Sequence, residues 1–165
     1  MDPLRLILLS FLLGVAPVSE IRGAIPFAAV SSSSPVEMAL GMAAGVAGNL
    51  LAPFAAFLVL KALDAIARWR RTPRAVAGLY EKIISYGRRK ASSIRGKRAV
   101  YAALAVFVAV PLPATGAWTG ALIAFVLGLD FRRSVLAIEA GVLGASGIVA
   151  AAVLGAYWLK AIFAL

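Results

Sequence analysis

The sequence predicts an all-α membrane protein with two inverted repeats, each a re-entrant hairpin plus a long transmembrane helix, joined by a basic cytoplasmic amphipathic helix. The chain has 165 residues, 62% of them hydrophobic, whereas soluble domains are about 45–50% apolar. Its two halves share one order of short apolar leg, proline-rich tip, short leg, turn and long apolar helix. The basic linker separates them, so we expect one domain over 1–165: repeat one 4–60, linker 61–98 and repeat two 99–165.

The first hairpin begins with a thirteen-residue apolar leg, residues 4–16. As a helix this leg covers about 20 Å, less than the ~30 Å hydrocarbon core of a bilayer. A tip follows over residues 17–26, and a second leg, 25–30, returns. Prolines at both ends of the tip predict that it is not one regular helix. Because irregular backbone at membrane depth needs protein or a water-filled cavity around it, the tip is expected to hold a polar site near mid-membrane.

A polar turn at residues 31–35 leads into the first long helix, residues 36–60. Ser34 is the expected N-cap, with Glu37 in the first turn. The small residues of Gly41-x-x-x-Gly45 allow another helix to approach closely, and either glycine-rich helix is a candidate seam for a homodimer. Asn49 and Pro53 interrupt this helix. Asn49 either bonds to a neighbouring helix in a kinked packing helix, or faces the same cavity as the first tip.

The linker, residues 61–98, contains twelve of the seventeen Lys and Arg residues and two acids, so 12 − 2 gives the entire formal net charge of +10. Between two hydrophobic halves, such a segment is expected in the cytoplasm. Apolar residues at helical spacing, among them Leu79 and Ile83, predict a basic amphipathic helix lying on anionic lipid headgroups. We expect the lipid bilayer, and not nucleic acid, as the partner of this segment.

The second half repeats the pattern of the first. Residues 99–110 form a short leg, residues 111–120 a tip and residues 121–129 a returning leg. A turn precedes a second long helix over residues 134–163. With the linker inside, the first hairpin enters from outside, the second from inside, and both termini lie outside a plasma membrane crossed more than once. Inverted repeats with broken helices that meet at mid-membrane are typical of transporters. In a competing topology each short leg is a full span, which the leg lengths disfavour.

Glu20 and Arg22 are the charged residues of the first tip. Intramembrane charges are costly unless paired or hydrated, so they are treated as a candidate site. Arg22 suits an anion, because guanidinium matches carboxylate or phosphate in a fork, and Glu20 is the best proton carrier. The alternative is a mutually neutralising pair that fixes the tip. Glu139 either extends toward Arg132 at the inner interface or lies on a proton path.

The second tip offers hydroxyls, an indole ring and freed backbone groups. Freed N–H groups at a half-helix start suit an anion, whereas freed carbonyls suit a cation. The candidate substrate- or ion-binding residues are Glu20, Arg22, Gly23, Pro26, Asn49, Pro111, Pro113, Thr115, Gly116, Trp118 and Thr119. The chain has no Cys and no His, so we expect no cofactor, no metal site and no enzymatic activity.

Three motifs resemble the small multidrug export protein family, which is more distantly related to the DedA membrane proteins. They are Ser19-Glu20-Ile21-Arg22-Gly23-Ala24-Ile25-Pro26, then Gly48-Asn49 with Pro53, and Pro111-Leu112-Pro113 leading to Thr115-Gly116-Ala117-Trp118-Thr119-Gly120. Ala114 stands where glycine is expected. The resemblance covers essentially the whole chain and implies paired re-entrant segments and transport, with relatives associated with lipid-carrier phosphate translocation or proton-coupled export.

The expected function is therefore a transporter or lipid translocase. Its substrate would be anionic, with lipid phosphate as one candidate, or small and amphipathic, and its movement would be coupled to protons. Two alternatives stay open: an uncoupled channel or lipid scramblase, and a membrane scaffold that transports nothing.

Overall fold

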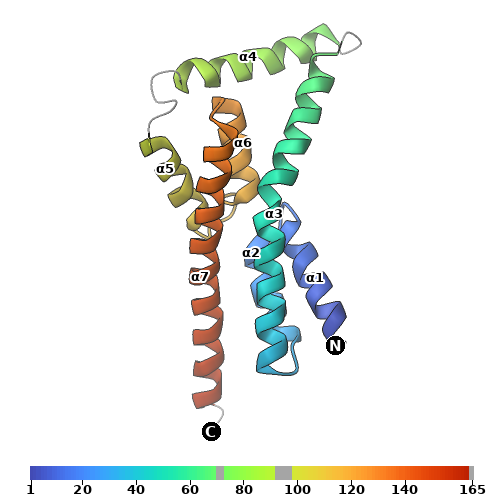
Figure 1. The fold of residues 1–165 in the computed structure, drawn as a ribbon, viewed down its shortest axis with the longest axis vertical. Helices are drawn as coiled ribbons and strands as arrows, with labels where there is room; N and C mark the ends of the chain where they lie inside the picture. The colour runs from blue at the N-terminus through green and yellow to red at the C-terminus, as the bar shows by residue number, and fades with distance from the viewer. Residues whose placement is uncertain (70–72, 92–97, 164–165) are drawn as a thin grey trace.

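The computed structural model describes residues 1–69, 73–91 and 98–163, and the regular elements of these ranges are all helices (Figure 1). The helices are α1 (Pro3–Val15), α2 (Glu20–Ser31), α3 (Pro35–Ala67), α4 (Arg74–Ala91), α5 (Arg98–Ala109), α6 (Ala117–Leu127) and α7 (Phe131–Phe163). The all-α prediction is confirmed for this part of the chain.

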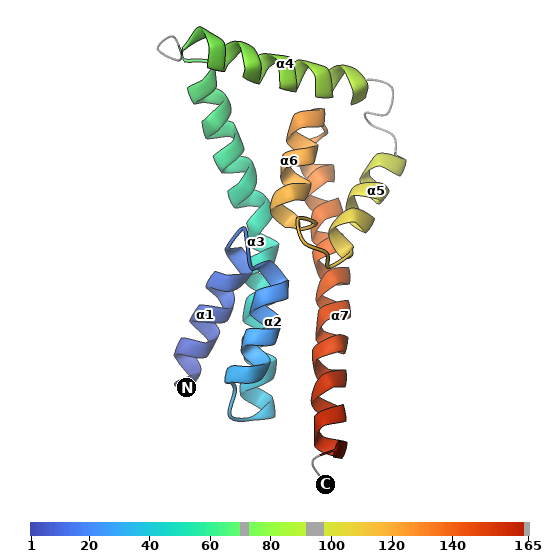
Figure 2. The ribbon, with the colours of Figure 1, turned by 180° about the vertical axis from the view of Figure 1, so that it is seen from behind.

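Two helical hairpins point toward each other from opposite ends of the molecule (Figures 1 and 2). The α1–α2 hairpin starts at the end that holds both chain termini, whereas the α5–α6 hairpin starts at the end covered by α4. The long helices α3 and α7 run past both hairpins, and α4 lies crosswise over one end. Both turns of chain that close the hairpins therefore lie in the middle of the molecule.

Length separates the helices into two classes. α3 has 33 residues, and both it and the Phe131–Leu159 part of α7 are long and apolar enough to cross a membrane, with hydropathies of 2.0 and 1.9. The four hairpin helices have 11 to 13 residues. At 1.5 Å per residue they cover about 16–20 Å, well short of a bilayer's ~30 Å core.

Glycines let the hairpins pack closely on the long helices. A Cβ at Gly14 would collide with the Gly45 carbonyl, and one at Gly48 with the Phe11 carbonyl, so α1 touches α3 backbone to backbone. On the other side, a Cβ at Gly141 of α7 would lie 2.6 Å from the Ala105 carbonyl oxygen of α5. The predicted close approach therefore occurs within one chain. A homodimer remains a proposal, and these glycines are already used inside the protomer.

The start of α3 follows its sequence signal. The Ser34 hydroxyl accepts from the Glu37 N–H at 3.2 Å, and the Glu37 carboxylate accepts from the Ser33 N–H at 2.8 Å. This reciprocal arrangement resembles a capping box and satisfies two N–H groups that the helix itself leaves free. Pro53 lies inside α3, and the ribbon bends near mid-helix (Figure 1), as expected where proline removes a backbone bond.

The tips are shorter than the sequence predicted. α2 begins at Glu20 and continues through Pro26, so the expectation that prolines keep residues 17–26 from forming a regular helix is wrong for all but the first few residues. Likewise, α6 begins at Ala117 within the predicted second tip. A proline removes one N–H and crowds one carbonyl, and a tightly packed helix tolerates that loss. Burial of Ile21, Ala24, Ile25 and Ala28 supplies such packing.

α4 is fastened to the end of α3 by a side-chain cluster. The Tyr80 hydroxyl donates to Asp64 Oδ1 at 2.6 Å, and Arg68 Nε donates to the same oxygen at 2.8 Å. Ile84 is buried, and Gly87 packs against Val126 of α6. A second apolar edge, with Leu79 62% exposed and Ile83 54% exposed, faces away from the protein.

We predict that Tyr80→Phe loosens α4, because it removes the donor to Asp64. Partial burial and this hydrogen bond raise the pKa of Tyr80 to about 12 from an ordinary value of 10.0. The neutral phenol donates, so the stabilisation is present below pH 10 and is lost as the pH rises through about 12. Thermal unfolding should show a loss of about 1 kcal/mol. The alkaline absorbance difference between wild type and Tyr80→Phe should titrate near pH 12.

Tyr86→Phe is the matched control, since the Tyr86 ring lies on the same helix and is 61% exposed. Equal melting temperatures for the two variants would show that the Tyr80–Asp64 contact contributes nothing to the attachment of α4.

Candidate functional site

The two hairpin tips meet through the carboxylate of Glu20. Glu20 Oε1 accepts from the backbone N–H of Trp118 at 3.2 Å, although the two residues lie 98 positions apart. Trp118 is in the first turn of α6, whose N-terminal N–H groups have no partners within the helix. The carboxylate of one hairpin therefore caps the helix of the other, and the partial positive charge of a helix N-terminus favours this arrangement.

Arg22 binds the other oxygen of the same carboxylate. Its Nη2 donates to Glu20 Oε2 at 3.1 Å, and the Glu20 and Arg22 side chains are 5% and 25% exposed. Residues two apart diverge on a regular helix, but Glu20 has a φ of 46°, in the left-handed region that residues other than glycine rarely adopt. This φ at the first residue of α2 is how the two side chains converge, within a helix start instead of the irregular loop predicted.

The second tip makes another contact with the first hairpin, and Trp118 is again the donor. The Trp118 indole donates from Nε1 to the backbone carbonyl of Val15 at 2.8 Å, where α1 ends. A Cβ on Gly116 would collide with the Glu20 carboxylate, so this N-cap position admits no side chain without displacing it. Thr115 holds the loop itself: its hydroxyl donates to the Val110 carbonyl and accepts from the Leu112 N–H.

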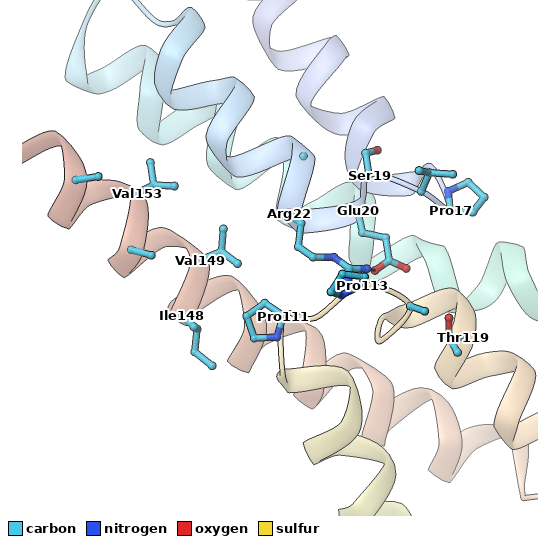
Figure 3. Close-up of a pocket in the computed structure, with 15 residues that line it drawn as sticks. Pro17, Ser19, Glu20, Arg22, Pro111, Pro113, Thr119, Ile148, Val149 and Val153 are labelled. Atoms are coloured by element: carbon cyan, nitrogen blue, oxygen red, sulfur yellow. Dashed lines mark hydrogen bonds and ion pairs between the residues drawn. The ribbon is translucent and has the colours of Figure 1, made fainter.

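A pocket of about 900 Å³ opens beside the Glu20–Arg22 pair (Figure 3). At the polar end of the pocket, the Arg22 side chain extends toward the Glu20 carboxylate (Figure 3). The lining residues are Pro17, Val18, Ser19, Glu20, Arg22, Gly23, Pro111, Pro113, Ala114, Thr119, Ile148, Val149, Ala152, Val153 and Ala156. The pocket thus combines one ion pair, two proline-rich tips and an apolar wall from α7.

A second, much smaller cavity lies on the inner side of the same ion pair. It is lined by Glu20, Ile21, Arg22, Asn49, Val108, Pro111, Thr115, Gly116, Ala117, Val142 and Ala145. Of the two interpretations of Asn49, the structure favours the cavity-facing one, because Asn49 is 2% exposed and its Oδ1 has no hydrogen-bond partner among the described residues.

Most of the predicted site residues line the pocket or the inner cavity, and Trp118, which lines neither, bonds Glu20 directly. Pro26 lies further along α2 and Glu139 on α7, and neither lines the pocket or the inner cavity. Glu139 is half-buried and forms no ion pair with Arg132, whose side chain belongs to the described part of the chain. The sequence analysis missed the α7 wall. Its residues recur on one helical face, but an apolar face carries no sign of what it will line.

The chemistry available here is charge recognition and proton binding. No group of three or more potential metal-ligating residues occurs among the described residues. The pocket offers a guanidinium that already holds a carboxylate and an apolar wall beside it. Such a site can take an anion in place of the carboxylate, or a proton on it.

We predict that Gly116→Ala displaces the Glu20 carboxylate and destabilises the protein by about 1–3 kcal/mol, since the added methyl group has no space. Ala114→Gly is the matched control in the same loop. Ala114 has a φ of 64°, where glycine is favoured, so this variant should be as stable as wild type or slightly more stable. Thermal unfolding in one detergent compares the two. Equal melting temperatures would contradict the close Gly116–Glu20 contact.

Comparison with known proteins gives one match. A search of curated proteins and a search of solved structures each found nothing similar. A family model described as "Putative small multi-drug export protein" matches residues 20–149. The match begins at Glu20 and ends at Val149, so it includes the Glu20–Arg22 pair, α3, the second tip and the first two residues of the α7 wall. Because it covers most of the chain, the chain belongs to the small multi-drug export protein family.

Proposed function

We propose that this protein is a secondary transporter for amphipathic anions and that Glu20 couples the movement to protons. The observation that carries the proposal is the shape and charge of the pocket. Glu20 and Arg22 lie at one end, and the α7 face from Ile148 to Ala156 forms an apolar wall. A molecule with an anionic head and an apolar tail fits this combination, with the head at Arg22 and the tail along α7.

Arg22 can serve either Glu20 or a substrate, and this gives the coupling. Its guanidinium bonds Glu20 Oε2, and charge-assisted bonds of this kind are stronger than neutral ones. A protonated Glu20 loses its charge and releases Arg22 to an anion. Proton and anion would then occupy the site together and move in the same direction.

The architecture supports alternating access. We propose that the two hairpins are re-entrant, that the halves are inverted repeats, and that their tips form the barrier between the two sides. The opposed hairpins and their short helices support this view (Figures 1 and 2). In this arrangement residues 61–98 lie in the cytoplasm against anionic headgroups. Both termini lie outside a plasma membrane crossed more than once.

We predict that dodecyl phosphate stabilises the detergent-solubilised protein against heat more than inorganic phosphate or dodecyltrimethylammonium does. The first probe has both the anionic head and the tail, and each of the others lacks one feature. Arg22→Ala should weaken the apparent affinity by at least about tenfold, because a charge-assisted bond is lost.

Arg133→Ala is the control, since Arg133 is exposed and lies outside the pocket. Equal stabilisation by dodecyl phosphate and dodecyltrimethylammonium would contradict the proposed anion site. An unchanged affinity of Arg22→Ala for dodecyl phosphate would also contradict it.

We predict that Glu20→Gln binds dodecyl phosphate but loses proton-driven transport, since the amide cannot exchange a proton. The measurement is accumulation of a fluorescent single-chain phosphate in vesicles under an imposed pH gradient. Wild type should concentrate the probe on the side toward which protons flow. Probe that only equilibrates would indicate a channel or scramblase, and no movement in wild type would favour a scaffold. Full accumulation by Glu20→Gln would contradict the coupling role.

A further inference from the structure

The cavity behind the ion pair is separate from the pocket in front of it. Glu20, Arg22 and Pro111 line both spaces. Asn49 and Ala145 line only the inner one, and Ala152 and Val153 only the outer one. The Glu20–Arg22 pair therefore lies between an open pocket and a much smaller, less open space.

Asn49 gives the inner cavity a strong hydrogen-bonding group. Asn49 is only 2% exposed, and its Oδ1 has no hydrogen-bond partner among the described residues. Leaving such an acceptor unsatisfied is costly, and native proteins commonly satisfy it with water. Pro53, one turn further along α3, has no N–H to donate to the Asn49 carbonyl.

The size of the cavity identifies the ligand class. Its volume is about 10 Å³, which is close to the smallest space that holds one water molecule. A water also needs two to four polar partners, and Asn49, Glu20 and Arg22 are among the residues that line the cavity. The remaining walls are mostly apolar, from α5, α6 and α7, so a larger or more polar ligand has no support here.

We propose that this cavity is an internal hydration site, in which Asn49 holds one water against the rear of the Glu20–Arg22 pair. The pair closes the site off from the pocket. This inference rests on the proposed function in one respect: the water gives Glu20 a hydrogen-bond partner on the side away from the substrate, through which a proton can pass. The hydration site itself and its closure do not depend on any substrate.

Closure can be tested by thiol labelling, because the wild-type chain contains no cysteine. Ala145→Cys places a thiol in the inner cavity, and Ala152→Cys places one in the pocket, two turns along the same helix. A small water-soluble methanethiosulfonate should modify the pocket thiol at least about tenfold faster, since the inner thiol reacts only through local opening. Adding Arg22→Ala or Glu20→Ala should speed labelling at the inner position and leave the pocket position unchanged.

Arg133→Ala in the Ala145→Cys chain is the control and should change nothing. Equal labelling of the two thiols in otherwise wild-type protein would overturn the closed cavity. Continued protection of the inner thiol in both the Arg22→Ala and the Glu20→Ala backgrounds would overturn the role of the pair as its wall. No substrate is involved, so these results stand whether or not the transport proposal fails.

The water itself requires a structure that resolves solvent. It should appear roughly 2.7–3.2 Å from Asn49 Oδ1, and it should be missing in Asn49→Leu, whose side chain fills the space without an acceptor. A protein donor bonded to Asn49 Oδ1 in the experimental structure, or an anhydrous cavity in wild type, would overturn the hydration site.

Discussion

The bond between the Glu20 carboxylate and the N-terminus of α6 is the interaction on which the centre of this molecule depends. It joins two hairpins that enter from opposite ends and that meet only at their tips (Figures 1 and 2). A carboxylate in an apolar interior is costly, and the free N–H groups of a helix start are costly for the same reason. Each group satisfies the other. Gly116 has no side chain that would collide with the Glu20 carboxylate, and the Trp118 indole donates a second bond, to the Val15 carbonyl at the end of α1.

The long helices determine where that contact occurs. Backbone-to-backbone packing at Gly14, Gly45 and Gly48 sets α1 against α3, and Gly141 does the same for α5 and α7. α2 and α6 each pack against both long helices, and the tips come together at mid-molecule. The same placement brings the apolar face of α7 beside Arg22. An amphipathic pocket is therefore a consequence of how the hairpins are supported.

Local signals predicted much of the fold, and long-range contacts account for most of what they missed. The lengths of the apolar segments predicted α1, α3, α5 and α7, and a serine followed by a proline predicted the start of α3 at Ser34. The prolines led to a tip that was predicted too long, because tertiary packing lets α2 continue through Pro26. Their charges identified Glu20 and Arg22 as candidate site residues, but Trp118, the second partner of Glu20, lies 98 positions away. No spacing rule reaches that far. The α7 wall was missed because apolar residues look alike whether they face lipid, protein or a pocket.

The way in which Glu20 is held is compatible with the proposed transfer of Arg22 from Glu20 to a substrate. If Arg22 only neutralised Glu20, its departure would leave a bare carboxylate in an apolar interior, at a cost of several kcal/mol. Here the helix start of α6 binds the other carboxylate oxygen, so Glu20 keeps a partner when Arg22 turns away. The Arg22 side chain remains 25% exposed at the pocket while the Glu20 side chain is almost fully buried. Among the described residues, the Glu20 carboxylate thus has two partners and the Arg22 guanidinium one, and in the proposed mechanism Arg22 is the member of the pair that binds the substrate.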